Sequence, residues 1–126
     1  MISQPVAVGL VLCAQVIVEE GTRHASLINT FTHWKGTTFP SVSRPFCVVS
    51  VLLEGEGDGT IRLTIIREDT AGVIDDVRHS VRFPDRLLEM RALFRVNDCS
   101  FPAAGLYFAT LSVDGEWVAQ RRFHVF

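Results

Sequence analysis

The chain has 126 residues, of which 48% are hydrophobic and 21% are charged, and its formal net charge is −2. These values are typical of one folded domain and argue against intrinsic disorder. The weak negative charge also argues against a nucleic-acid partner or an anionic membrane surface. We therefore expect a single domain over residues 1–126, with no nucleic acid and no membrane as its partner.

The cysteines are odd in number and lie far apart in the sequence, at Cys13, Cys47 and Cys99. This spacing matches neither a disulfide framework nor a metal-binding cysteine pair. Each cysteine stands in or beside an apolar run, where an unpaired thiol behaves as a small hydrophobic side chain. We expect free buried thiols, as in a protein of a reducing bacterial cytoplasm.

Residues 5–18 are apolar except for Gln15. No lysine or arginine precedes them, so the basic start of a secretion signal is missing. The run, at about 14 residues, is also shorter than the roughly 20 that a membrane-spanning helix needs. We predict instead a long buried strand over residues 6–19. Alternation would place its apolar residues on one face, namely Val6, Val8, Leu10, Leu12, Ala14, Val16 and Val18.

The segments that follow indicate a hairpin, a connection and a central strand. Residues 24–32 alternate after a turn at 20–22, so they are predicted to pair with the first strand. Residues 33–45 contain one glycine and two prolines, which predicts a connection between sheets. Residues 46–53 are apolar on both faces, as a strand in the middle of a sheet would be.

Alternating patterns continue in the second half. They predict strands at 61–68 and 73–83, the second of which ends before Pro84. Residues 87–97 are ambiguous, because their apolar residues fit either a helical stripe or an alternating strand. We predict a strand there, with a helical turn at 85–89 as the alternative.

The last two strands, 106–112 and 116–125, flank Asp114-Gly115, which is a strong hairpin signal. A two-residue loop would place Trp117 opposite Ser112. A three-residue loop ending at Gly115 would instead pair Leu111 with Trp117 and keep apolar residues together. We expect the second register.

Phe101-Pro102-Ala103-Ala104-Gly105-Leu106-Tyr107 is a turn followed by Gly-x-Tyr at the start of a strand. It resembles the tyrosine corner of immunoglobulin-like sandwiches, where the phenol donates a hydrogen bond to an upstream backbone group. With about seven to eight strands and no predicted helix, the chain is expected to be all-β. We predict a two-sheet antiparallel Greek-key sandwich of immunoglobulin-like architecture.

Several short segments, spread over nearly the whole chain, carry a family resemblance. They are Leu12-Cys13-Ala14-Gln15-Val16-Ile17-Val18-Glu19-Glu20-Gly21, Ser26-Leu27-Ile28-Asn29, Phe39-Pro40, Phe101-Pro102, Gly105-Leu106-Tyr107 and Val113-Asp114-Gly115. These segments are similar to a family of short bacterial proteins that is catalogued as a domain of unknown function. Members of that family often have Asp at the position of Ala14. The resemblance implies a cytoplasmic β-sandwich and supplies no catalytic residue.

The densest group of titratable side chains lies on the predicted strand 73–83. Alternation places Asp75 and His79 on one face and Arg78 and Arg82 on the other, so these four are the candidate ligand-binding residues. The simpler interpretation is that they are strand-end charges and cross-strand ion pairs on a solvated face. No spacing typical of a catalytic, cofactor or metal site is present in the sequence.

The sequence therefore favours a non-enzymatic protein-interaction or binding module, with another protein or a second copy of the chain as its partner. Exposed apolar residues such as Val118 and Phe126 would support this interpretation if they formed a patch. The alternative is a small-ligand or metal-binding protein with its site near Asp75 and His79. No cofactor is predicted.

Overall fold

The computed structural model describes residues 5–85 and 87–126, and these residues form eleven strands and no helix. The strands are β1 (Val6–Val18), β2 (Ala25–Phe31), β3 (His33–Trp34), β4 (Ser41–Val42), β5 (Phe46–Leu53), β6 (Gly57–Arg67), β7 (Val73–Phe83), β8 (Met90–Val96), β9 (Ser100–Phe101), β10 (Gly105–Val113) and β11 (Glu116–Val125). This number of strands exceeds the predicted seven to eight because β3, β4 and β9 are short strands of only two residues each.

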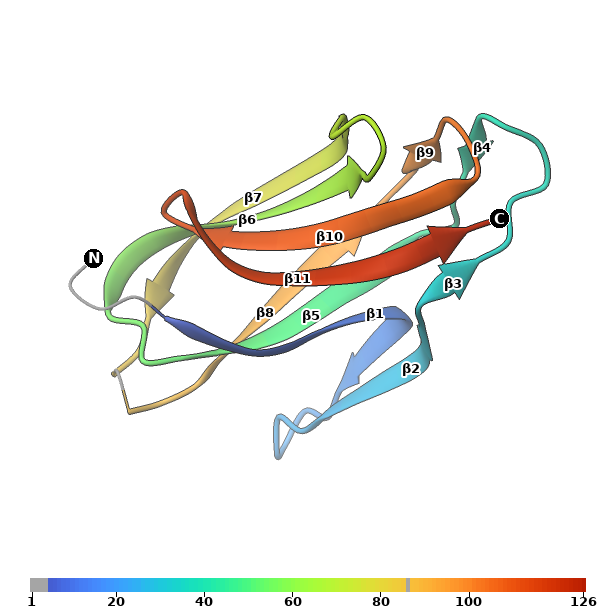
Figure 1. Ribbon diagram of the computed structural model, residues 1–126. Coiled ribbons are helices and arrows are strands. Elements are labelled where there is room, and N and C mark those ends of the chain that lie inside the picture. Colours follow the sequence, from blue (N-terminus) through green and yellow to red (C-terminus); the bar gives the residue numbers. More distant parts are fainter. Residues whose placement is uncertain (1–4, 86) are drawn as a thin grey trace.

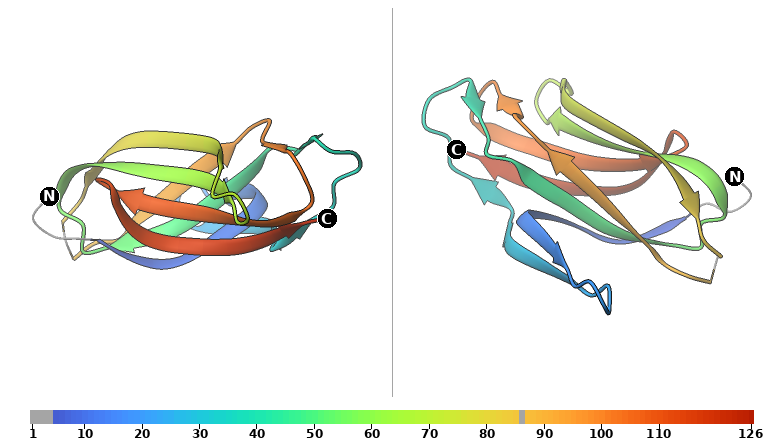
Figure 2. Two further views of the ribbon diagram at one scale, coloured as in Figure 1. Left: turned by 45° about the horizontal axis from the view of Figure 1, so that its top comes forward. Right: turned by 180° about the vertical axis from the view of Figure 1, so that it is seen from behind.

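The strands form two packed sheets, as Figures 1 and 2 show. Sheet A has the order β2-β1-β5-β8 and sheet B the order β3-β11-β10-β6-β7, while β4 and β9 form a separate short pair. The pairing is antiparallel except between β11 and β3. Seven strands, β1, β5, β6, β7, β8, β10 and β11, correspond to those of an immunoglobulin domain. The fourth of them (β7) pairs with the third (β6) rather than with the fifth (β8). The predicted immunoglobulin-like sandwich is confirmed.

The core lies between the two sheets because inward-facing apolar residues alternate along the strands. In β8 every second residue from Ala92 to Val96 is buried, and in β10 the same holds from Tyr107 to Val113. The alternation at 90–96 therefore predicted a strand correctly. A turn precedes it, in which the backbone N–H of Leu88 donates to the carbonyl oxygen of Asp85 at 2.8 Å. Residue 86, within the range of the helical-turn alternative, lies outside the described residues.

The predicted tyrosine corner is present. The hydroxyl of Tyr107 donates to the carbonyl oxygen of Ala103 at 2.6 Å, and the Tyr107 side chain is buried. Its ring packs edge-on against Phe101, at 4.9 Å between centroids, and stacks on Phe123 at 5.9 Å. The corner therefore fixes the crossover from β9 to β10 against the core.

The predicted single apolar face of the first strand is wrong at its start. A β-bulge lies between Val8 and Val11, where Gly9 has a φ of 69°. The bulge adds one residue to β1 and reverses the faces, so Leu10 and Leu12 point into the core while Val6 and Val8 are 51% and 55% exposed. Simple alternation could not show this reversal.

The expected register of the last hairpin is also wrong. Asp114 and Gly115 both have positive φ, at 50° and 83°, and form a two-residue loop that places Ser112 opposite Trp117. A bulge then shifts the register, so that Leu111 pairs with Ala119. The turn is held to β6, because the backbone N–H of Thr60 donates to the Asp114 carboxylate at 2.9 Å. The bulge, rather than a longer loop, keeps Leu111 in the core.

The outer half of the β1–β2 hairpin, residues 14–29, lies across the outer face of sheet A (Figure 1). We call this segment the folded hairpin. Its bend falls where Asn29 has a left-handed φ of 53°. At its tip the carbonyl oxygen of Arg23 accepts a hydrogen bond from Arg91 Nη2 on β8 at 3.0 Å. The hairpin predicted for residues 24–32 is confirmed, and the structure adds its folded-back course.

Candidate ligand-binding pocket

The short strands β3, β4 and β9 lie at one end of the sandwich (Figure 2). A pocket of about 620 Å³ opens at this end. We call it the end pocket. The connection from β2 to β5 forms most of its wall, together with the bend of the folded hairpin. It is lined by Ala14, Asn29, Thr30, Phe31, His33, Trp34, Lys35, Thr37, Ser41, Val42, Ser43, Arg44, Pro45, Phe46, Phe101 and Phe123.

Aromatic rings form the apolar part of the end pocket. Trp34 packs on Phe101 at 5.3 Å between centroids, and Phe31 packs edge-on against Phe46 at 5.7 Å. Phe101 also contacts the tyrosine corner, so the pocket floor is continuous with the main core. Rings held this firmly give a preformed apolar surface for a ligand.

The polar groups of the end pocket favour an anion. Lys35 and Arg44 line it, and no Asp or Glu does. Ser43 is 6% exposed, and within the described chain its hydroxyl oxygen is buried without a hydrogen-bond partner. Buried hydroxyls are normally hydrogen-bonded. The Ser43 hydroxyl and the two cations can therefore serve a ligand that carries both negative charge and hydrogen-bonding groups.

The sequence pattern did not predict this pocket, because residues 33–45 were expected to be only a connection. The expectation was correct in part, since the segment leaves β2 in sheet A and joins sheet B through β3. One feature of the sequence could have indicated the pocket. Trp34, Arg44 and the single lysine of the chain, Lys35, are close together in a segment that contains two prolines. The aromatic floor comes partly from β9 and β11, so no local pattern could have revealed it.

The structure places the four candidate residues of β7 on two different faces. Asp75 and His79 pair with Ile65 and Ile61, whose side chains point into the core, so both lie on the inner side at the edge of sheet B. The His79 ring stacks on Phe94 at 5.2 Å. The carboxylate of Asp75 accepts a hydrogen bond from the next backbone N–H, at 2.9 Å.

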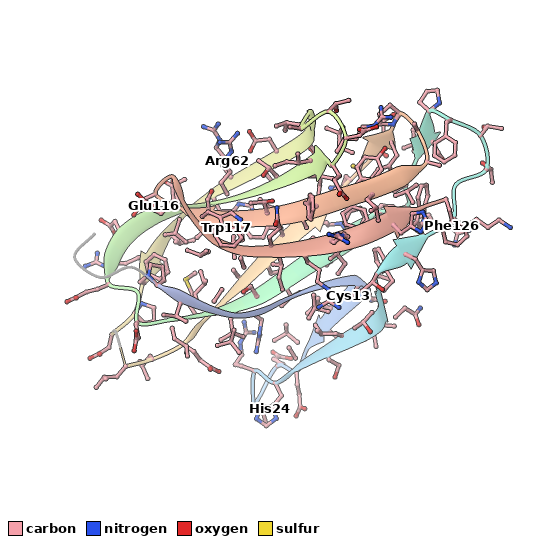
Figure 3. All side chains as sticks on the ribbon, viewed as in Figure 1. Cys13, His24, Arg62, Glu116, Trp117 and Phe126 are labelled. Carbon is pink, nitrogen blue, oxygen red and sulfur yellow. The ribbon has the colours of Figure 1, made fainter. Side chains whose placement is uncertain are left out.

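Arg78 and Arg82 lie on the outer face of β7, away from Asp75 and His79. On this face Asp76 accepts hydrogen bonds from Arg62 Nε and Nη2 at 2.9 and 2.8 Å, and Arg78 lies 3.5 Å from the same carboxylate. Arg62 points away from the sandwich (Figure 3). The hydrogen bonds from Arg62 lower the pKa of Asp76 and raise that of Arg62. Arg82 stands opposite Asp58.

Val118 and Phe126, the two apolar residues expected to be exposed, lie near opposite ends of the chain's last strand. Val118 is partly buried against the core near one end of β11, whereas Phe126 follows its other end and is 46% exposed (Figure 3). These two residues therefore form no common patch.

Within residues 5–85 and 87–126, no three His, Cys, Asp or Glu side chains are grouped so that they could hold a metal ion. The same residues contain no helix that could cross a membrane.

The fold and the end pocket define the class of the protein: an immunoglobulin-like β-sandwich with an open pocket at one end of its two sheets. The chain belongs to the family described as "Family of unknown function (DUF6941)", which it matches over residues 9–126. The resemblance to a family of unknown function is thereby confirmed. No curated protein sequence matches the chain. Among solved structures it is similar to an immunoglobulin-like protein from Pseudomonas aeruginosa, with 12% identity, a TM-score of 0.44 and coverage of 98% of this chain and 97% of that one.

Proposed function

We propose that the domain is a non-enzymatic binding module whose end pocket takes an anionic ligand with an apolar part. The observation that carries this proposal is the lining of the pocket, which includes Lys35, Arg44 and aromatic rings but no Asp or Glu. The volume, about 620 Å³, lies within the roughly 300 to 1,000 Å³ of ordinary small-ligand sites. The ligand chemistry is that of a carboxylate beside an aromatic or branched aliphatic group.

Binding accounts for the pocket better than catalysis does. General acid–base or nucleophilic chemistry needs a base, acid or nucleophile held by a partner. The titratable groups that line the pocket are the side chains of Lys35, Arg44 and His33. His33 stacks on Phe126 at 6.0 Å between centroids. Two cations and one stacked imidazole suit recognition of charge.

The proposal includes a bacterial cytoplasmic location and a protein-borne or free ligand. The three cysteines are free and buried, which suits a reducing compartment. The carboxylate and apolar group can belong to a small molecule or to a segment of a partner protein or second copy. Native mass spectrometry of protein purified gently from its host separates these sources, because one leaves a small adduct and the other a defined complex.

The proposal is tested with 1-anilinonaphthalene-8-sulfonate, a probe that joins an anion to aromatic rings. In a Trp117→Phe background Trp34 is the only tryptophan, so its fluorescence reports on the end pocket. We expect the double variant Lys35→Glu/Arg44→Glu to weaken binding about tenfold, since two attractive charges become repulsive. Arg82→Glu on the outer face of β7 is the matched control. Equal affinity in all variants would contradict the proposal.

The alternative, a small-ligand or metal site near Asp75 and His79, has less support. The His79 ring is occupied by stacking on Phe94, and Asp75 accepts a hydrogen bond from its own backbone segment. Arg82→Glu cannot examine this alternative, because Arg82 lies on the opposite face of β7 from Asp75 and His79. His79→Ala examines it instead: if this variant weakened probe binding more than the double variant did, the ligand site would belong beside Asp75 and His79.

A further inference from the structure

Cys13 and Cys47 face each other beneath the folded hairpin. They are directly opposite in the antiparallel pairing of β1 with β5, on the outer face of sheet A. Val16 and Leu27 of the folded hairpin pack against both of them and against Val49. Cys13 is fully buried and Cys47 is 5% exposed. Figure 3 shows Cys13 between the sheet and the hairpin.

The register of this pair places the two residues within the Cα separation that a disulfide requires. Residues directly opposite in an antiparallel pair have Cα atoms about 4.5 to 5.5 Å apart, within the roughly 4.4 to 6.8 Å that disulfides take. Their side chains point to the same side of the sheet. The two thiols also interact electrostatically, because burial raises the pKa of Cys13 and Cys47 raises it further.

We propose that Cys13 and Cys47 form a reversible disulfide by exchange with a low-molecular-weight disulfide such as oxidised glutathione. The more accessible Cys47 thiolate attacks the reagent, which forms a mixed disulfide and releases one small thiolate. The Cys13 thiolate then attacks the Cys47 sulfur and displaces the second small thiolate. The protein loses two protons and two electrons, and the reagent becomes two thiols.

The folded hairpin controls access to the pair. Local opening of the hairpin must precede attack, because Val16 and Leu27 cover the two sulfurs. The hydrogen bond from Arg91 to the carbonyl oxygen of Arg23 holds the tip of the hairpin on β8. Removal of this bond by Arg91→Ala therefore exposes the thiols more often and speeds disulfide formation.

The disulfide also borders the end pocket. Ala14 follows Cys13, Thr30 is the β2 partner of Cys13, and Phe46 precedes Cys47; all three neighbours line the pocket. The cross-link ties the pocket wall on β1 and β2 to the wall on β5. A wall that is fixed in advance costs less to order on binding, so the oxidised protein binds the probe more tightly. This consequence, unlike the disulfide itself, rests on the proposed function.

The test oxidises the native full chain in glutathione buffers of increasing potential, then denatures it and counts the alkylatable thiols by intact mass. We expect the count to fall from three to one, and peptide mapping to join Cys13 to Cys47. Cys99→Ala should keep the cross-link, whereas Cys13→Ala and Cys47→Ala should each lack it. Cys99 is a matched control because its burial, with the charge of Asp75, raises its pKa to about 12.

Each part of the proposal can be overturned separately. Three free thiols in the native wild type at every potential, or a cross-link to Cys99, would refute the disulfide. An unchanged oxidation rate in Arg91→Ala, with Arg82→Ala as control, would refute the role of the hairpin. Oxidised and reduced proteins should differ about threefold in probe affinity, and equal affinities would refute the link to the pocket. Failure of the reduced protein to bind the probe would count against the proposed function alone.

Discussion

The hydroxyl of Tyr107 and the carbonyl oxygen of Ala103 join the start of β10 to the loop that leads into it, through a 2.6 Å hydrogen bond. The bond is local in sequence, yet its donor ring stands among the aromatic residues of both the core and the end-pocket floor. Phe101 contacts the Tyr107 ring on one side and Trp34 of the pocket on the other. The corner therefore supports the site as well as the sandwich.

We predict that Tyr107→Phe lowers the free energy of unfolding by about 1 to 3 kcal/mol, because the part-buried carbonyl of Ala103 loses its hydrogen-bond donor. Urea unfolding should show a lower midpoint with an unchanged slope. Thr110→Val is the control, since Thr110 accepts only an exposed 3.4 Å bond from Gln120. Its effect should stay below about 0.5 kcal/mol. Equal losses of unfolding free energy in both variants would mean that the tyrosine corner does not stabilise the fold more than an exposed hydrogen bond does.

The fold was predictable wherever burial alternates without interruption. In β8 and β10 every second side chain faces the core, so two-residue periodicity shows both the strand and its buried face. Alternation failed at the bulges, near Gly9 in β1 and beside Ser112 in the last hairpin. A single extra residue reverses the face of all residues beyond it, and no residue pattern on that strand records the partner's register.

Gly55 is predicted to tolerate no side chain. A Cβ at this position would overlap the ring of Phe83, which is buried at the end of β7. We expect Gly55→Ala to destabilise the fold by about 1 to 3 kcal/mol, as overpacking of a core does. In Gly21→Ala the new Cβ meets nothing within 4 Å, so this control should change stability by less than about 0.5 kcal/mol. Thermal unfolding of both variants checks the difference, and similar melting temperatures would contradict it.

Asp76 should make stability depend on acid pH. The hydrogen bonds from Arg62 lower its pKa in the folded protein below the ordinary 3.8. A lowered folded pKa stabilises the protein above that ordinary value, and the stabilisation is lost as the pH falls through the folded pKa. Asp76→Asn should therefore lower the free energy of unfolding at pH 7. The loss should be smaller than that in Tyr107→Phe, because the Arg62–Asp76 ion pair is partly exposed.

Urea midpoints of wild type and Asp76→Asn between pH 7 and pH 2 measure this effect. The two curves should converge as the pH falls below 3.8, and added salt should narrow their separation at pH 7. Asp58→Asn removes a carboxylate from the neighbouring strand β6 and is the control for net charge. A gap that widened toward low pH would show that the Arg62–Asp76 pair does not stabilise the fold.

The end pocket was hidden from the sequence for a different reason than the bulges. Its cations lie in a connection, where charged residues are ordinary, and its floor comes from β9 and β11 far along the chain. Only the folded core brings Phe101 against Trp34 and Phe123 against Phe101. The charged group on β7 was visible in the sequence because its members are close neighbours there. Strand alternation then separates Asp75 and His79 from Arg78 and Arg82, as the structure shows.

Gly9 sets the bulge of β1, and its substitution should show that conformation rather than space is the constraint. Its φ of 69° lies in the left-handed region, while an added Cβ would meet nothing within 4 Å. We expect Gly9→Ala to cost about 1 to 2 kcal/mol, the strain of a left-handed residue that has a Cβ. Gly9→Asn should cost less, because Asn adopts this conformation more readily. Urea unfolding measures the stability of both variants. If Gly9→Asn were less stable than Gly9→Ala, the cause would be crowding or loss of the 2.6 Å hydrogen bond from the Ser50 hydroxyl to the Gly9 carbonyl oxygen.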